Sequence, residues 1–305
     1  MIDFYAYGNP GCYSKPDNKD GSATTAKQWK DYSDCGFNVM FLGGNNMWQG
    51  DGAITKKCFA FAKELGFKKV LIRDERLYAD ILGNKVAPVK SLVGESCKFA
   101  TQAELDDYVK NCLSDYIHEE AFIGLSFMDE PNYESANAYG QLYRAVKRVG
   151  AVLGKPDIHI QTMIEGKHRV AWRSFAKGGT LDENYDEFFR AYTDGVGKLD
   201  FLGTDLYPFK LDNDGETPRF MDGYFNALKI FADYCKKTDT EFGFVLQSYE
   251  LVGNYYPLAT HRLYSINEMM LQINVALGLR AGTIMFYTYE DFGSAEGTGY
   301  RSYGE

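Results

Sequence analysis

Two adjacent carboxylates end an apolar run in the segment LSFMDEPNYESANAY, residues 125–139. Asp129 and Glu130 stand directly before Pro131. Because proline has no backbone N–H to donate to a neighbouring strand, the pattern predicts that a strand ends here. Burial and a neighbouring negative charge both favour the protonated form of a carboxyl group, so Glu130 is a candidate general acid. Since adjacent strand residues point to opposite faces, we expect one of the pair to face a pocket and the other to support it.

This segment is one of eight short apolar runs that recur along the chain. The runs span residues 4–8, 37–43, 68–75, 122–130, 158–165, 199–209, 241–249 and 282–290. Their middles do not alternate strictly between apolar and polar residues, which is typical of strands buried on both faces.

Helical patterns separate these runs, at residues 24–36, 52–67, 101–117, 133–154, 184–197, 221–237 and 265–278. Thr101 and Glu104 form a capping-box pattern, and Gly36 and Gly66 are expected to end two other helices. Strand and helix in alternation predict parallel strands, and eight strands predict a closed (β/α)8 TIM barrel of the α/β class, with residues 1–305 as a single domain. The glycine-rich tail after the eighth run predicts that the eighth helix is missing or truncated.

Chemistry in such barrels lies at the carboxyl ends of the strands, so the residues that end each run are the candidate site residues. Cleavage of a glycosidic bond needs two carboxyl groups, one to protonate the leaving oxygen and one to attack or to activate water. The candidates for substrate binding are Asp129, Gln247, Tyr207, Arg73, Trp48, Glu165, Glu290 and Asn45. Arg73 either forms an ion pair with Asp74 or Glu75, or holds a substrate hydroxyl or a catalytic carboxylate. Trp48 either stacks on a sugar ring or packs beneath a loop.

Three segments together resemble the large clan of (β/α)8-barrel glycoside hydrolases. FIGLSFMDEP, residues 122–131, resembles the fourth-strand signature, in which the acid/base Glu stands at the strand end. LDFLGTDLYPF, residues 199–209, resembles the sixth strand, and residues 242–290 resemble the seventh strand, its helix and the eighth strand. The resemblance implies an enzyme that cleaves O-glycosidic bonds of an oligo- or polysaccharide, with Glu130 as the general acid/base.

The chain departs from this clan at the seventh strand. Retaining members place the nucleophilic Glu at its end, and here Gln247 occupies that position. An amide can hydrogen-bond a sugar but cannot form a glycosyl ester, so the second carboxylate is expected elsewhere. Asp205 and Glu250 are the favoured candidates, and Glu165 and Glu290 are the alternatives. A wide separation of the two carboxyl groups, about 6.5–9.5 Å, would suit an inverting mechanism.

Two other functions also fit the sequence. In one, the chain is a non-catalytic carbohydrate-binding barrel, and Gln247 stands where a nucleophile was lost. In the other, it is a barrel enzyme of a different class, such as a lyase or an isomerase. A barrel fold alone predicts no chemistry, so the site residues must decide between these functions.

Composition narrows the possible partners. A net charge of −9 argues against nucleic-acid and anionic-membrane partners, whereas the 23 Tyr fit a cleft that stacks on sugar rings. No apolar run reaches about 18 residues, which predicts no transmembrane helix. Zinc-ligand spacings and phosphate loops are both missing, so no metal or other cofactor is expected.

The six cysteines form no CxxC pair and are expected to be mostly free, buried thiols. The N-terminus MIDFYAYGNPGCY lacks a basic segment followed by an apolar one, so no signal peptide is expected in this chain. Secretion or the cell surface is the alternative if the natural chain is longer. The sugar, its linkage and the oligomeric state have no signal in the sequence.

Overall fold

The computed structural model describes most of the strands and helices of the chain. The described residues are 2–7, 10, 23–42, 52–79, 82, 89–129, 135–165, 199–212, 217–252, 262, 264–287, 292–293 and 299–302. The predicted helix at 184–197 lies outside them. Among the described residues, no helix is both long enough and apolar enough to cross a membrane.

Eight parallel strands form the central sheet. They are β1 (Asp3–Ala6), β2 (Met40–Leu42), β3 (Val70–Ile72), β4 (Phe122–Asp129), β5 (His159–Glu165), β6 (Phe201–Asp205), β9 (Glu241–Gln247) and β11 (Thr283–Tyr287). Their order is β1-β11-β9-β6-β5-β4-β3-β2. The two edges approach each other where the backbone N–H groups of Asn38 and Val39 donate to the carbonyl oxygen of Phe4, at 3.0 and 3.3 Å. The predicted (β/α)8 barrel is therefore confirmed as a nearly closed barrel.

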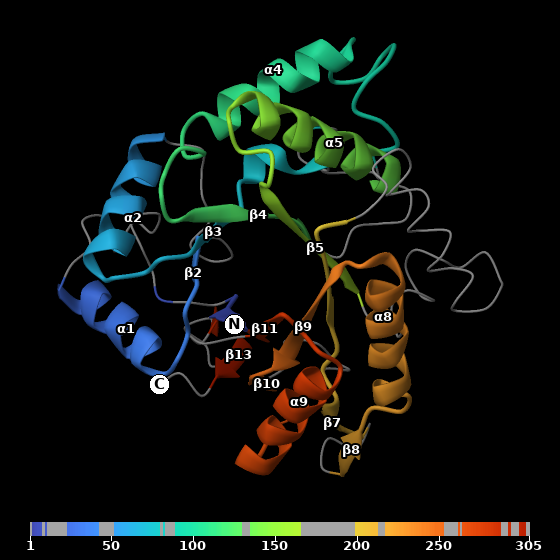
Figure 1. The fold of residues 1–305 in the computed structure, drawn as a ribbon. Coiled ribbons are helices and arrows are strands. Elements are labelled where there is room, and N and C mark those ends of the chain that lie inside the picture. The colour runs from blue at the N-terminus through green and yellow to red at the C-terminus, as the bar shows by residue number, and fades with distance from the viewer. Residues whose placement is uncertain are drawn as a thin grey trace.

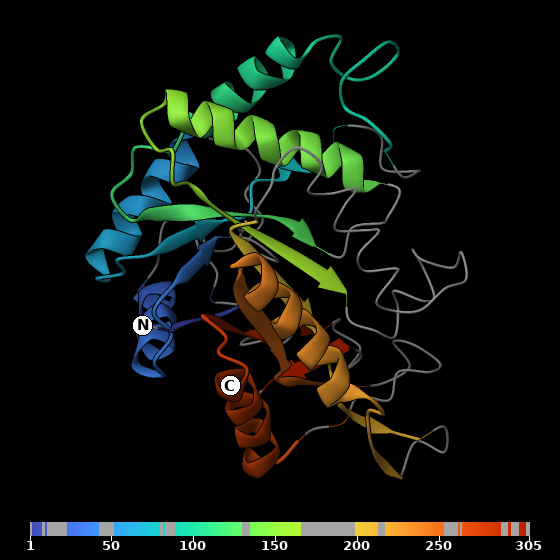
Figure 2. The ribbon, with the colours of Figure 1, turned by 45° about the vertical axis from the view of Figure 1, so that its right-hand side comes forward.

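Helices lie around this sheet, as Figure 1 shows. The described helices are α1 (Ala23–Asp34), α2 (Gly52–Glu64), α4 (Gln102–Leu113), α5 (Ala136–Val152), α8 (Tyr224–Thr238) and α9 (Ile266–Gly278), with a short 3₁₀ turn η2 (Glu75–Leu77). Helices α4 and α5 pack against each other, and α8 packs on β6 and β9 (Figure 2). Each helix lies between two consecutive strands of the barrel or follows one of them, as the alternating pattern predicts.

The predicted helix ends also agree with the structure. Gly36 and Gly66 adopt left-handed backbone angles, with φ of +96° and +82°, where a glycine pays no steric penalty. Oγ1 of Thr101 accepts a hydrogen bond from the backbone N–H of Glu104 at 3.3 Å. The Glu104 carboxylate, however, accepts from the backbone N–H of Ala100, so the predicted reciprocal bond is displaced by one residue.

Two of the predicted runs each contain more than one strand. Residues 199–209 comprise β6 and the start of β7 (Phe209–Leu211), which pairs with β8 (Pro218–Phe220). Residues 241–249 comprise β9 and the start of β10 (Tyr249–Val252). The described parts of the glycine-rich tail form β12 (Phe292–Gly293) and β13 (Gly299–Ser302), which join β10 in an antiparallel sheet. This agrees with the expectation that the tail is not a helix.

The barrel interior is a separate apolar cluster inside the ring of strands. Its buried members are Tyr5, Tyr7, Val39, Phe41, Leu71, Met163, Phe201, Val245 and Met285. A Cβ atom on Gly243 would lie 1.9 Å from Cζ of Phe201, so only glycine leaves room for that ring. A Cβ atom on Gly203 would likewise lie 2.4 Å from the sulfur of Met163. Glycines on two adjacent strands thus make space for the large side chains that fill the interior.

The cysteines agree with their predicted state where they are described. Cys58, Cys112 and Cys235 are buried, Cys35 is exposed, Cys97 is half-buried, and all are free thiols. Cys12 lies outside the described residues. Burial raises the pKa of Cys112 and that of Cys235 to about 12, so these thiols remain protonated at neutral pH.

Candidate active site

Three neighbouring strands carry carboxylate residues to the same end of the barrel. The backbone of Asp129, at the end of β4, pairs in register with Met163 of β5. Glu165, at the end of β5, pairs with Asp205 at the end of β6. The Asp205 side chain is half-buried. Because parallel strands all end at one rim, this register brings the carboxyl ends of β4, β5 and β6 side by side.

Some predicted site residues lie outside the described part of the chain. They are Glu130, Trp48, Asn45 and Glu290. The chain position of Glu130 is nevertheless defined, since it directly follows Asp129 at the end of β4.

Glu250, a favoured candidate for the second carboxylate, belongs to a strand and not to a loop after β9. It lies in β10, and its backbone pairs in register with that of Arg301 in β13. The backbone of Glu250 is therefore held in the small antiparallel sheet, whereas that of Asp205 is part of the barrel.

Four tyrosines gather at this end of the barrel, and we call Tyr7, Tyr207, Tyr249 and Tyr287 the tyrosine cluster. The rings of Tyr207 and Tyr249 meet edge to face, with centroids 5.1 Å apart. Tyr287 lies 5.2 Å from Tyr249, 5.8 Å from Tyr207 and 6.2 Å from Tyr7. Tyr207 and Tyr287 are half-buried. Tyr7 and Tyr249 are buried, so the exposed part of the cluster belongs to Tyr207 and Tyr287.

The sequence named only Tyr207 of this cluster as a candidate. Tyr249 ends a predicted run, and Tyr7 and Tyr287 lie one and three residues before the ends of two others, at β1 and β11. The signal that could have found them was this common position at strand ends. Their mutual contact depends on the sheet order, which places β1, β11 and β9 next to one another.

Gln247 lies at the end of β9 as expected, but its side chain is 0% exposed. Its Oε1 accepts from the backbone N–H of Phe209 at 2.9 Å, and its Nε2 lies 3.1 Å from the carbonyl oxygen of Phe209. The same Nε2 lies 3.2 Å from the carbonyl oxygens of Tyr249 and Arg262. A sugar hydroxyl has no access to the amide in this arrangement.

Arg73 follows β3, and its guanidinium lies 5.0 Å from the centre of the Tyr78 ring, a cation–π distance. Asp74 does not take Arg73 as its ion-pair partner. Its carboxylate accepts instead from Nε and Nη2 of Arg76, with the shortest distance 2.7 Å. Nη1 of Arg76 reaches Asp115 at 2.8 Å.

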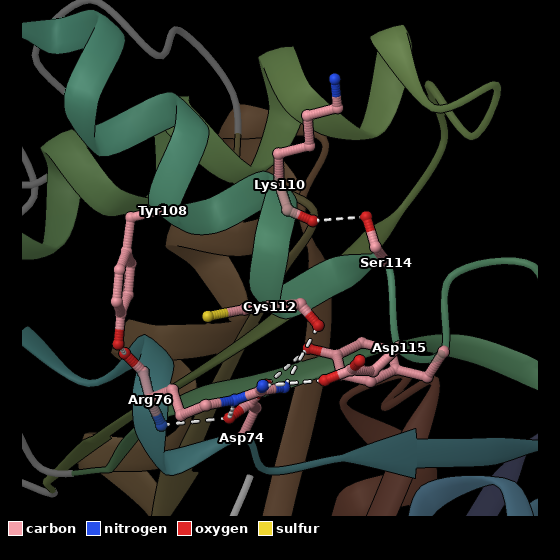
Figure 3. A network of polar contacts seen from close by, with 8 residues as sticks. Asp74, Arg76, Tyr108, Lys110, Cys112, Ser114 and Asp115 are labelled. Atoms are coloured by element: carbon pink, nitrogen blue, oxygen red, sulfur yellow. Dashed lines mark hydrogen bonds and ion pairs between the residues drawn. The ribbon is translucent and has the colours of Figure 1, made fainter. Parts of the chain in front are cut away.

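This ion-pair network fastens the segment after β3 to α4 (Figure 3). Asp74 is fully buried and also accepts from the hydroxyl of Tyr116 at 3.0 Å. The hydroxyl of Tyr108 donates to the carbonyl oxygen of Arg76 at 3.1 Å. Burial, followed by the charge and hydrogen bond of Asp74, raises the pKa of Tyr116 well above its ordinary value. The network therefore supports the rim near Arg73 from the side of the helices.

Comparison with known proteins gives structural relatives alone. No family model and no curated protein sequence matches the chain. The β-glucuronidase of Ruminococcus gnavus is similar in structure, with a TM-score of 0.53 and 12% identity over 97% of this chain and 44% of that one. This chain thus spans less than half the length of that protein.

Two other solved structures match over most of their own length. A Bacteroides thetaiotaomicron VPI-5482 protein proposed to be an α-L-fucosidase has a TM-score of 0.57 and 10% identity, over 97% of this chain and 88% of that one. XacCel5A, solved in complex with cellopentaose, has a TM-score of 0.57 and 14% identity, over 98% and 93%. The chain therefore has the (β/α)8 fold that these glycosidases share, and at such low identity the likeness extends to the fold alone.

Proposed function

We propose that the chain is a glycoside hydrolase in which Glu130 is the general acid and Asp205 is the second carboxylate. The register that ends β4, β5 and β6 at one rim carries this proposal. Glu130 directly follows β4, and Asp205 ends β6, so the two residues come from strands that flank β5. Two carboxyl groups from different strands, on either side of one site, are the requirement for cleaving a glycosidic bond.

The amide at the end of β9 favours inversion, because Gln247 cannot form the glycosyl ester of a retaining mechanism. Carboxyl groups in inverting enzymes are about 6.5–9.5 Å apart, which leaves room for the attacking water, and those in retaining enzymes are only about 5–5.5 Å apart. Asp205 would then act as the base that activates this water.

The tyrosine cluster supports a carbohydrate as the partner. Aromatic rings that are partly exposed beside carboxylates offer an apolar face for a sugar ring, and their hydroxyl groups offer hydrogen bonds. Tyr207 and Tyr287 are the half-buried members of the cluster, so we assign the contact with the sugar to them. We include Arg73 and the strand-end residues Asp129, Glu165, Asn45, Trp48 and Glu290 as further substrate contacts.

A glycan screen tests the proposal. The wild type and Glu130→Gln are incubated with a broad panel of plant, bacterial and host glycans, and the released sugars are read by mass. The matched control is Glu120→Gln, the same change at an exposed residue just before the opposite end of β4. We expect release by the wild type and the control, and none by Glu130→Gln.

The alternatives give different results in the same screen. Binding of a glycan without release by the wild type would favour the non-catalytic carbohydrate-binding barrel. Release that persists in Glu130→Gln would mean that another residue is the acid. Products whose masses show that no water was added to the substrate would indicate a lyase or an isomerase.

A further inference from the structure

Gln247 connects segments that are far apart in the sequence. Its amide forms a paired hydrogen bond with the main chain of Phe209, at 2.9 Å through Oε1 and 3.1 Å through Nε2. Phe209 begins β7, whereas Gln247 ends β9. The Gln247 side chain thus satisfies the main-chain N–H and C=O groups of Phe209, as a neighbouring strand would, where β7 leaves the barrel. The Gln247 amide also contacts the carbonyl oxygen of Arg262, and so it connects β9 to the segment that precedes α9.

The backbone of Gln247 is itself held by a second buried amide. Oε1 of Gln272, in α9, accepts from the N–H of Gln247 at 2.9 Å, and Nε2 of Gln272 donates to its carbonyl oxygen at 3.0 Å. Gln272 is also 0% exposed. Two glutamines therefore form a continuous hydrogen-bonded connection from α9 through β9 to β7. Because both amides are buried, loss of either would leave main-chain groups without partners, which is costly.

The segments held in this way carry two members of the tyrosine cluster. Tyr207 lies two residues before Phe209, and Tyr249 lies two residues after Gln247. Their rings meet edge to face at 5.1 Å. The carbonyl oxygen of Tyr249 is itself a partner of the Gln247 amide at 3.2 Å. A change in the amide would therefore move both rings relative to each other.

We propose that Gln247 is a positioning residue that sets Tyr207 for sugar binding through the buried ring of Tyr249, and that it is neither a sugar contact nor the remnant of a nucleophile. The role in sugar binding rests on the proposed function, whereas the positioning of the two rings does not. A glutamate would serve poorly at this position. An ionised carboxylate only accepts hydrogen bonds, and here it would face the carbonyl oxygens of Phe209, Tyr249 and Arg262.

The first arm of the test measures the environments of the two tyrosine rings by ¹⁹F NMR and needs no substrate. The protein is labelled with 3-fluorotyrosine, and the ¹⁹F resonances of Tyr207 and Tyr249 are assigned from the Tyr207→Phe and Tyr249→Phe variants. Gln247→Met, which keeps the length of the side chain but loses its hydrogen bonds, should shift both resonances. The resonance of Tyr143 in α5 should stay in place. Unchanged Tyr207 and Tyr249 resonances would overturn the proposal.

A second variant keeps the test decisive if Gln247→Met does not fold. Gln247→Glu should retain a near-native ¹⁹F spectrum at about pH 5, where burial keeps the new carboxyl group protonated and able to donate. At about pH 8 the two resonances should depart from those of the wild type, because the ionised group has nothing to donate. Resonances of Tyr207 and Tyr249 that keep their wild-type positions after the new carboxyl group has ionised would contradict the positioning role.

The second arm uses the glycan found in the screen. Gln247→Met should raise KM about tenfold while kcat falls less than about threefold, the pattern of lost substrate binding. The control is Val146→Ala, a buried residue of α5, which lowers stability but should leave KM and both resonances unchanged. Shifted resonances with unchanged KM would overturn the role in sugar binding. If no glycan is cleaved or bound, the proposed function fails, and the ¹⁹F arm still decides whether Gln247 positions the rings.

Discussion

The backbone of Glu165, at the end of β5, pairs in register with that of Asp205, at the end of β6. Strand β4, which ends at Asp129, lies next to β5 in the barrel. Like charges on neighbouring strands are unfavourable, so such an arrangement is typical of a functional site rather than of a structural one. The chemistry proposed for the chain depends on this rim.

Asp205→Asn should lower glycan hydrolysis by about 10²–10⁴-fold, the range by which a general base contributes to catalysis. The amide keeps the size of the side chain but cannot take a proton from water. The comparison is Asp239→Asn, a residue before β9 in a left-handed conformation that Asn also adopts. NMR of the first product should show an inverted anomeric configuration in the wild type. Clean retention would contradict the assignment of Asp205 as a water-activating base.

Asp74→Ala should lower the free energy of unfolding by about 3–5 kcal/mol, because it leaves the Arg76 guanidinium without its buried partner. Urea denaturation followed by circular dichroism measures this loss. Asp31→Ala, which removes an exposed pair with Lys27 within α1, should cost only about 0.5 kcal/mol. Equal losses in the two variants would show that the ion-pair network after β3 contributes no more than a surface pair.

The buried thiols should resist alkylation in the folded protein. Burial raises the pKa of Cys112 and Cys235 to about 12, and the thiolate is the reactive form. Iodoacetamide at about pH 8, followed by peptide mass spectrometry, should modify the exposed Cys35 and spare Cys112 and Cys235. In urea all three should react. Rapid labelling of Cys112 under native conditions would mean that the helix layer around α4 opens readily.

Glu268 should stabilise the start of α9 only above acidic pH. Its hydrogen bond with Arg262 is the largest cause that holds its pKa below the ordinary value of 4.5, and burial opposes it. A carboxyl group with a lowered pKa in the folded state contributes stability above that ordinary value and loses it as the pH falls. Glu268→Gln should therefore cost about 1 kcal/mol at neutral pH and progressively less below about pH 4.5. Thermal unfolding at several pH values measures this, with Glu64→Gln as the neutral comparison; a loss that does not change with pH would contradict the ion-pair explanation.

The barrel strands were predictable from sequence because each is a local apolar run, and β4 and β5 in particular are long and continuous. The boundary between β9 and β10 was not, since β10 pairs with β13, about fifty residues later, and nothing near Tyr249 signals that partner. Gln247 illustrates the same limit within the site. Its type and its place at a strand end were visible in the sequence, but its partner Phe209 is 38 residues away, so its main-chain contacts could not be predicted.

The tyrosine cluster could be predicted from the sequence in part: the positions of its residues could, but their contacts could not. Tyr7 directly follows β1, Tyr207 lies two residues after β6 and Tyr287 ends β11, and these positions near strand ends can be read from the sequence. The contact of Tyr287 with Tyr207 depends on the barrel curvature, which brings residues from non-adjacent strands together above the interior. Curvature results from the packing of residues such as Phe201 against Gly243, which no local pattern expresses.

If Glu130 donates a proton to the leaving oxygen, the effect of replacing it depends on whether the leaving group needs that proton. The wild type and Glu130→Gln are compared on the natural glycan and on the 2,4-dinitrophenyl glycoside of the same sugar, whose phenolate departs without a proton. Glu130→Gln should lose about 10³-fold or more on the glycan and less than about tenfold on the dinitrophenyl glycoside. Equal losses on both substrates would contradict the assignment of Glu130 as the general acid.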